Sequence, residues 1–401
     1  MTTDAAVARF IPRSGAGWRD PFGMYAALRD HDPVHHVADG DYWVLSRFDD
    51  VFAAARDTDR FSSAQGLTFS YDDMAFAGLE EARPIVMMDP PAHTEFRRLV
   101  SRAFTPRSVA ALEPTVRSFV AERIDGLRRE GGGDVAAAVF KPLPSMVVAH
   151  YLGVPPSDRD QFDRWTEMIV AASAAGDATG APNAVMELFG YFSDLVEYRR
   201  ASGDVGDDTI STLVSAGAGT VATLGILGFA FTMVTGGNDT TTGLLGGAAE
   251  LLTDRPDQRE LLLADPDAIP AAVEELLRLT SPVQGLARTT TTDVSLEGRT
   301  IPAGRRVMLL FASANRDEGR FGPDAAELDV TRDAKPILSF GYGAHHCLGA
   351  AVARLQARVA LEELLSRCPR FAVDAAAGEF APGHFVRRYL HLPFDPEGLA
   401  A

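Results

Sequence analysis

The longest stretch without a charged residue lies between Asp208 and Asp239, and its centre, LGILGFAFTMVTGG, is almost entirely apolar. A segment of this length could span a bilayer. It contains many Gly and Thr residues, however, and it lacks the flanking Lys or Arg residues and the aromatic belt of membrane helices. The pattern therefore predicts a long helix buried in the core of a large protein.

Helical patterns dominate the rest of the chain from DPFGMYAALRD onward, with Pro, Asp or Gly at their ends. Strand patterns are short and occur in two places. Residues 34–48 contain two apolar runs around Asp39-Gly40, which predicts a hairpin, and residues 294–311 alternate short strands with Gly turns. We therefore expect a mainly α-helical protein with small peripheral β-sheets, folded as a single domain over residues 1–401.

Composition narrows the possible partners. The 401 residues are 46% hydrophobic, which is ample for a large core. The net charge of -17 argues against nucleic acid or an anionic membrane as a partner. The first residues have no apolar segment typical of a signal peptide or anchor. Two cysteines, Cys347 and Cys368, cannot form a disulfide framework or a four-thiolate zinc site. We expect a cytoplasmic protein.

Cys347 lies in the run SFGYGAHHCLGAAVARL. The glycines at 341, 343 and 349 leave out side chains where the backbone must bend tightly or approach a flat ligand. Apolar residues at 348, 352, 355 and 359 form a helix face that starts directly after the cysteine. A cysteine at a helix N-terminus is stabilised as a thiolate, so we expect a lowered pKa.

Four chemical roles are possible for Cys347. A zinc site would lack partner cysteines, and covalent haem attachment would need C-x-x-C-H, which is not there. A nucleophile would need a distant base, which the sequence leaves open. A thiolate ligand of haem iron agrees best with the glycines and the following helix. Cys368, in SRCPRF, has no such context, and we expect an ordinary thiol.

The run FGYGAHHCLG matches the F-G-x-G-x-H-x-C-x-G signature of the cytochrome P-450 monooxygenases at every fixed position. The whole chain resembles soluble actinobacterial members of this family. The resemblance implies the cytochrome P-450 fold and haem b as cofactor. It implies that Cys347 is the iron ligand, that Phe340 packs near the sulfur, that His345 binds a propionate, and that Gly341 and Gly349 contact the cofactor.

Two further runs resemble the propionate-binding segments of the family. DPPAHTEFRRLV has two prolines where a helix should start, which places His93 and Arg97 on one face. A guanidinium and an imidazolium both pair well with a carboxylate. The resemblance implies that these two residues bind one propionate, and that Arg288, in QGLARTT, contacts the other.

The run VEELLRL places Glu275 and Arg278 three residues apart on one helix face. Taken alone, this spacing is typical of an exposed ion pair. Beside the cysteine loop it resembles the E-x-x-R pair that supports the structure beneath the haem. A third basic partner is common in the family, but Glu327 stands near its expected position, so Arg332 is the candidate.

MVTGGNDTTTG places Gly-Gly, an acid and a run of three consecutive threonines inside the long apolar helix. A buried Asp is costly unless it is neutralised or hydrogen-bonded, a mid-helix Gly costs about 1 kcal/mol, and threonines can bend a helix. A plain kink is the alternative. The run resembles the oxygen-binding kink of the family, which implies that Thr240 acts in oxygen activation and Asp239 in proton delivery.

The sequence indicates only the polarity of the substrate. Family substrate-contact regions correspond to residues 67–87 and 168–175 and to the candidates Met233, Val234, Gly236, Gly237, Val283, Leu286 and Phe385. These positions are mainly apolar, so we expect a hydrophobic small molecule, and Gly236 should leave extra room over the haem. Residues 171–182 are a candidate mobile lid.

The resemblance implies a haem-thiolate monooxygenase that uses O2 for hydroxylation or oxidative dealkylation. Without a dinucleotide motif, its NAD(P)H electrons should come through ferredoxin reductase and ferredoxin. We expect a monomer. The basic residues near the cysteine form either ordinary solvent-exposed helix faces or a patch that binds an acidic ferredoxin. These residues are Arg98, Arg102, Arg354 and Arg358. The alternatives are a peroxide-driven haem enzyme of the same fold and a non-catalytic haem-based ligand binder.

Overall fold

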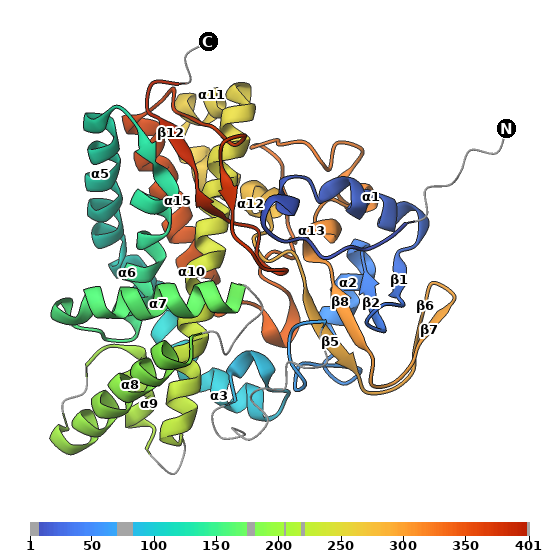
Figure 1. Cartoon of the computed structure of the whole chain (residues 1–401), viewed down its shortest axis with the longest axis horizontal. Coiled ribbons are helices and arrows are strands. Elements are labelled where there is room, and N and C mark those ends of the chain that lie inside the picture. Colours follow the sequence, from blue (N-terminus) through green and yellow to red (C-terminus); the bar gives the residue numbers. More distant parts are fainter. Residues whose placement is uncertain (1–7, 70–82, 175–180, 204–205, 218–220, 399–401) are drawn as a thin grey trace.

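The computed structural model describes residues 8–69, 83–174, 181–203, 206–217 and 221–398. Within these residues the protein is mainly α-helical, as the sequence predicts (Figure 1). The α-helices are α1 (Phe22–His31), α2 (Phe48–Arg56), α3 (Ala92–Val100), α4 (Pro106–Ala111), α5 (Glu113–Glu130), α6 (Pro142–Tyr151), α7 (Arg159–Ala174), α8 (Pro182–Ser202), α9 (Thr209–Ser215), α10 (Thr223–Asp254), α11 (Pro256–Ala264), α12 (Ile269–Thr280), α13 (Phe311–Ala314), α14 (Glu318–Phe321) and α15 (Ala350–Arg367).

The β-strands are short and form small sheets. They are β1 (Val34–Val37), β2 (Tyr42–Leu45), β3 (Phe61–Ser62), β4 (Gly133–Asp134), β5 (Leu286–Thr290), β6 (Val294–Leu296), β7 (Arg299–Ile301), β8 (Arg306–Leu309), β9 (Ala372–Val373), β10 (Glu379–Phe380), β11 (Tyr389–His391) and β12 (Pro393–Asp395). The main sheet has the order β1-β2-β8-β5-β3 and lies beside the helical part of the molecule (Figure 1).

Both predicted strand regions are confirmed. β1 and β2 form an antiparallel hairpin with Val34 opposite Leu45, and Gly40 in its turn has a φ of 102°. β6 and β7 form a second hairpin, and β8 pairs in parallel with β2. β5, which carries Arg288, was not predicted as a strand. Four of its five residues are buried, so it lacks the polar and apolar alternation by which a half-exposed strand is recognised.

Helix α10 connects two hydrophobic clusters. Its first half contributes Ile226, Phe229 and Val234 to one cluster, and its second half contributes Leu245 and Leu252 to the other. The long uncharged stretch is therefore a core helix, as predicted, and it runs through the helical part of the molecule (Figure 1). Among the described residues, no helix is long and apolar enough to cross a membrane.

Candidate active site

Cys347 lies in a short loop between a 3-10 turn at Gly343–His345 and the first residue of α15. The Cys347 amide donates a hydrogen bond to the Phe340 carbonyl at 2.9 Å, which closes the loop. Gly341 and Gly343 have φ values of 63° and 72°, a region that favours glycine. The loop therefore presents the Cys347 side chain at an exposed position directly before a helix, as the sequence predicts.

Gly343 has a packing role that the sequence did not indicate. A Cβ atom there would lie 2.9 Å from the Ala55 carbonyl oxygen and 3.1 Å from the Arg56 Cα. At Gly343 the backbone of the cysteine loop therefore lies directly against the end of α2. Gly349 has open space around its Cβ position, with nothing within 4 Å.

The electrostatics of the Cys347 thiol differ from the expectation. Desolvation by the surrounding protein raises the pKa of this thiol. The Gly349 amide, Arg97 and Arg354 act in the opposite direction, but their combined effect is smaller. The prediction that the helix N-terminus alone lowers the pKa is therefore wrong for the metal-free thiol. A metal cation bound to the sulfur would favour the thiolate over the thiol, because it displaces the thiol proton. Cys368 is buried and its pKa is raised to about 11, which agrees with an ordinary thiol.

Two imidazoles lie together beside the cysteine loop. The rings of His93, on α3, and His345 are 4.2 Å apart between centroids. The His345 Nε2 lies 3.2 Å from the Ser63 Oγ. Burial, together with Arg288, His93 and Arg97, lowers the pKa of His345 to about 3. His93 is 2% exposed, and its buried Nδ1 has no hydrogen-bond partner.

Arg97 and Arg288 add two guanidinium groups to this cluster. Arg97 donates to the Ala344 carbonyl at 3.1 Å and to the His346 carbonyl. Arg288 is 6% exposed and donates to the Ala287 carbonyl at 2.8 Å; burial lowers its pKa to about 10. In the parts of the chain that the structure describes, neither forms an ion pair with a carboxylate.

These side chains fit haem. Buried cations without a carboxylate partner are costly, and the two propionates of haem would supply two carboxylates. The orphaned Nδ1 of His93 is a further group that a propionate oxygen would satisfy. Cys347, an exposed residue, would supply a sulfur ligand for the iron. A zinc site at Cys347 is less well supported, because no group of three metal-ligating side chains occurs among the described residues.

Helix α10 exposes a small patch at its centre. Gly236 is exposed, and a Cβ atom there would have no neighbour within 4 Å. One turn later, the Thr240 hydroxyl donates to the Gly236 carbonyl at 2.9 Å. The open space predicted at Gly236 is thus present, and the Thr240 side chain lies against the same helical turn.

Two substrate-contact candidates on α10 face elsewhere. A Cβ atom on Gly237 would lie 2.7 Å from a methyl group of Val148, so this glycine allows α6 to pack closely against α10. Val234 is fully buried in a hydrophobic cluster. Val234 is therefore enclosed by packed neighbours in this structure, whereas the backbone of Gly237 stays partly exposed.

The remaining candidates are partly exposed apolar side chains: Met233, Val283, Leu286 and Phe385. Two of them come together through an isolated bridge between Val283 and Val386 and a 2.7 Å hydrogen bond from the Gln284 amide to the Phe385 carbonyl. Phe69 lies 5.5 Å from Phe385 between ring centroids. Of the predicted substrate regions and lid, residues 70–82 and 175–180 lie outside the described residues.

Asp239 forms an ion pair that the sequence did not reveal. Its Oδ1 lies 2.6 Å from the Nε of Arg388, and both side chains are buried. Burial raises the pKa of Asp239 to about 6, against the opposing effects of Arg388 and Lys141. The run RRYLHLPF gave no local signal for this contact, because the partner acid lies in a different part of the sequence.

Glu275 and Arg278 form a fully buried pair on α12. Two hydrogen bonds of 2.7 and 2.8 Å join them, and both side chains are 0% exposed. Arg278 also donates to the Asn315 and Ala325 carbonyls at 2.6 Å. Arg332 lies 3.2 Å from Glu275, which confirms it as the third partner. The pair therefore joins α12 to the chain that leads into the cysteine loop.

The four candidate partner-docking arginines fall into two groups. Arg354 pairs with the buried Glu274 and lies over the Phe340 ring at 4.5 Å, and Arg358 pairs with Glu113 and Glu362. These two are engaged in contacts within the protein. Arg98 and Arg102 are exposed and form no ion pair with any described residue.

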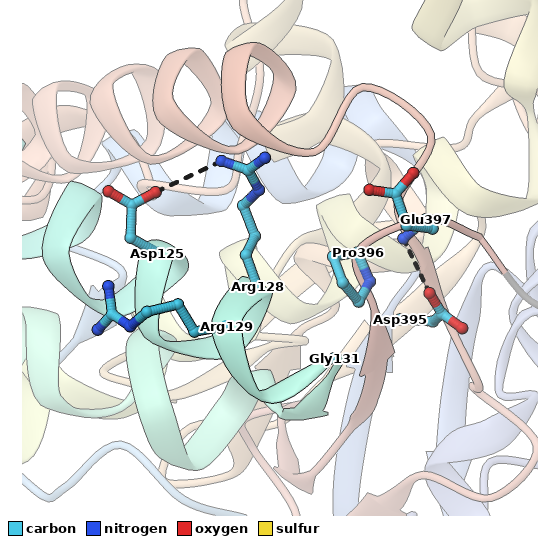
Figure 2. Close-up of a pocket in the computed structure, with 7 residues that line it drawn as sticks. All are labelled: Asp125, Arg128, Arg129, Gly131, Asp395, Pro396 and Glu397. Atoms are coloured by element: carbon cyan, nitrogen blue, oxygen red, sulfur yellow. Dashed lines mark hydrogen bonds and ion pairs between the residues drawn. The ribbon is translucent and has the colours of Figure 1, made fainter.

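A surface pocket of about 450 Å³ lies between the end of α5 and the C-terminal strands, as Figure 2 shows. Its lining includes Asp125, Arg128 and Glu397. Asp125 also pairs with Arg367 at the last residue of α15. The pocket is therefore at the opposite end of α15 from Cys347, and it belongs to a different part of the molecule.

The chain is similar to known proteins over nearly its whole length. A family model for cytochrome P450 matches residues 249–375. The chain is 62% identical over 387 residues to Cytochrome P450 130 of Mycobacterium tuberculosis strain H37Rv, covering 94% of this chain and 95% of that relative. It is 39% identical over 388 residues to the vitamin D(3) 25-hydroxylase of Pseudonocardia autotrophica, covering 95% and 94%. The structure of cytochrome P450 CYP109Q5 from Chondromyces apiculatus has a TM-score of 0.84 at 36% identity, covering 96% of this chain and 97% of that one.

Proposed function

Because the chain belongs to the cytochrome P450 family of haem b monooxygenases, we propose that it inserts one oxygen atom of O2 into a hydrophobic small molecule. The product arises by hydroxylation or oxidative dealkylation. For hydroxylation the balance is one substrate, one O2, two electrons and two protons, giving one alcohol and one water. The observation that carries the proposal is the exposed Cys347 beside the buried Arg288, the partly buried Arg97 and two imidazoles, none of which has a carboxylate partner among the described residues.

The cofactor would be held from two sides. Cys347 would bind the iron, and Arg97, Arg288, His93 and His345 would bind the propionates. Haem bound through a thiolate supplies the iron at which O2 is reduced and its O–O bond is cleaved. Burial lowers the pKa of both closely packed imidazoles in the protein alone. The two guanidinium groups would supply permanent positive charge to the propionates, and the imidazoles would supply hydrogen-bond donors.

Helix α10 would supply the protons. Thr240 keeps its hydroxyl beside the open turn at Gly236, next to where the oxygen would be reduced. Asp239 has a pKa of about 6, so it exchanges its proton readily near neutral pH. The close packing at Gly237 and Val148 restricts bulk water on the other face of the helix.

The electrons would come from NAD(P)H through ferredoxin reductase and ferredoxin. The support for a docking surface now rests mainly on Arg98 and Arg102, since Arg354 and Arg358 are held in pairs with Glu274, Glu113 and Glu362. Exposed cations of this kind would attract an acidic partner and accelerate its association. A monomeric, cytoplasmic protein stays a prediction from the sequence.

The substrate would be a largely apolar molecule. Met233, Val283, Leu286 and Phe385 are apolar and partly exposed, and Gly236 on α10 has open space at its Cβ position. One relative is named as a vitamin D(3) 25-hydroxylase, which supports a hydrophobic small molecule here.

The test has two stages. The purified holoprotein is reduced under carbon monoxide, and a thiolate-type absorption band near 450 nm is expected. Apolar compounds are then screened for shifts of the ferric Soret band, and those that bind are incubated with NADH, ferredoxin reductase, ferredoxin and 18O2. One 18O atom in the product supports the proposal. Product formed only with hydrogen peroxide would favour the peroxide-driven alternative, and binding without product under every condition would favour the ligand binder.

A further inference from the structure

One face of α10 carries an unusual order of residues, with an acid, two glycines and a second acid. Asp239, Gly243, Gly246 and Glu250 follow one another at helical spacing, so they lie on the same side of the helix. A Cβ atom on Gly243 would lie 2.5 Å from the Arg387 carbonyl oxygen and 3.4 Å from the Arg388 Cβ. The glycines therefore let the backbone of residues 387–389 lie directly against the helix.

The two arginines of this segment pair with the two acids. Arg387 lies 3.2 Å from Glu250 and donates to the Trp18 carbonyl at 2.8 Å. Arg388 lies 2.6 Å from Asp239. Arg388 is 4% exposed and Asp239 is 8% exposed, so the second pair is shielded from solvent. A buried arginine that faces one carboxylate restricts the orientation of that carboxylate, because leaving it would strand an unpaired charge.

Lys141 is the other cation that acts on Asp239. It lies at the start of α6 and pairs with Glu167 of α7 near the surface. Burial raises the pKa of Asp239, and Arg388 acts in the opposite direction more strongly than Lys141 does. The proton affinity of Asp239 therefore depends chiefly on its burial and on Arg388.

We propose that Arg388 is a positioning residue for oxygen activation, which fixes the orientation and the charge of the Asp239 carboxylate from the C-terminal segment. The inference rests on the proposed function, in which Asp239 delivers protons. Arg388 keeps Asp239 ionised at the start of each cycle, so that the carboxylate can take a proton from the solvent side and pass it on. The glycine at 243 is part of this arrangement, since a side chain there would displace Arg388.

The test compares Arg388→Met with Arg388→Lys, Gly243→Ala and the matched control Arg387→Met, which removes the adjacent ion pair on the same helix. The first readout is the infrared carboxyl band of Asp239 in the resting ferric holoprotein, assigned with labelled aspartate and the Asp239→Asn variant. In Arg388→Met its titration midpoint should rise by about one pH unit or more, because the opposing cation is gone. In Arg388→Lys and Arg387→Met it should stay near the wild-type value.

The second readout is the ratio of product formed to NADH consumed, measured from pH 6 to pH 8.5. We expect Arg388→Met to lose about tenfold in this ratio, most strongly between pH 6 and pH 7, where Asp239 would be protonated in the variant and ionised in the wild-type protein. Arg388→Lys should recover most of it, and Gly243→Ala should follow Arg388→Met in part. Gly190→Ala on α8, where a Cβ has no neighbour within 4 Å, is the control for the glycine change.

An unchanged infrared midpoint in both Arg388→Met and Gly243→Ala would overturn the inference, and so would a ratio in Arg388→Met equal to that in Arg387→Met. If Arg388→Met does not fold, Gly243→Ala provides the test. Its titration midpoint for the Asp239 carboxyl band and its ratio of product to NADH consumed then support or contradict the inference. Failure of the proposed function is distinguishable, because the wild-type protein would then form no product while its carboxyl band would still titrate.

Discussion

The Cys347 loop and the Asp239 segment of α10 differ in where their supporting contacts come from. Cys347 depends on the Phe340 carbonyl and the Gly349 amide, both within a few residues of it. Asp239 depends on Arg388 from the C-terminal segment and on Lys141 from the start of α6. A sequence motif therefore captures the first site almost completely, whereas only the folded chain assembles the second. Five sets of substitutions test the contributions of local and distant contacts.

The largest effect is expected for Cys347→Ser. A serine hydroxyl is a poor ligand for haem iron, so the thiolate-type carbon monoxide band should be lost together with all NADH-dependent product formation. The matched control is Cys368→Ser at the buried cysteine, which should keep the band and the activity. A retained band near 450 nm in Cys347→Ser would show that the iron ligand is elsewhere.

The second effect concerns Glu275→Gln. Arg278 would remain fully buried without a negative partner, and breaking such a pair costs about 3–5 kcal/mol. Chemical unfolding of the holoprotein and its haem content measure this loss. Arg255→Met, at an exposed ion pair with Asp257, should cost far less, because solvent screens this pair. Equal losses in the two variants would contradict a structural role for the buried pair.

Neighbouring glycines on α10 give the third comparison. Gly237→Ala would place a methyl group 2.7 Å from Val148 and should destabilise the fold by about 1–3 kcal/mol through overpacking. Gly236→Ala has open space and should leave stability unchanged or slightly higher, while weakening the binding of the bulkiest ligands. Thermal unfolding and spectral titration separate the two effects. Equal stability of both variants would mean that α6 does not pack closely at Gly237.

The fourth effect depends on pH. Asp239 has a pKa of about 6 in the folded protein, above its ordinary value of 3.8, so its protonated form stabilises the fold and this contribution is lost as the pH rises through 6. Relative to Asp239→Asn, the wild-type protein should lose about 1.4 kcal/mol between pH 5 and pH 7.5. A pH-independent difference between wild type and Asp239→Asn would refute this assignment.

The smallest effect is expected at the surface. Reversing Arg98 and Arg102 to Glu should slow reduction by ferredoxin about tenfold at low salt, with little change in stability, because these side chains have no ion pair among the described residues. Reversing Arg354 and Arg358 should lower stability as well, since their partners Glu274 and Glu113 would face like charges. Stopped-flow reduction and thermal unfolding are measured together. Unchanged reduction rates in the first variant would exclude α3 from the docking surface.

The sequence predicted those parts of the site whose geometry follows from neighbouring residues. The Cys347 loop, the helix that carries His93 and Arg97, and the pair of Glu275 with Arg278 all have fixed spacings within a few residues. The long uncharged helix was also predicted, because its burial follows from its composition alone.

The remaining features depend on distant contacts. The pairing of Asp239 with Arg388 joins two segments without a common motif, and Val234 and Gly237 face packed helices although they lie next to an open turn. The raised pKa of Cys347 results from desolvation of the thiol in the folded protein, which its position before a helix does not reveal. Which face of a helix meets which neighbour is decided by tertiary structure.

The acid-bearing face of α10 also has a consequence for biosynthesis. Asp239 and Glu250 leave the ribosome well before Arg388 and Arg387, because a chain is made from its N-terminus. Until those arginines have been synthesised, the central helix would have to bury two carboxylates without their cations. The nascent chain should therefore keep this helix loosely packed, and its core should close only after residues 387–389 emerge. A pulse of protease during translation would detect this late closure. The protease should cleave within α10 in shorter nascent chains and should stop cleaving there once residues 387–389 have emerged.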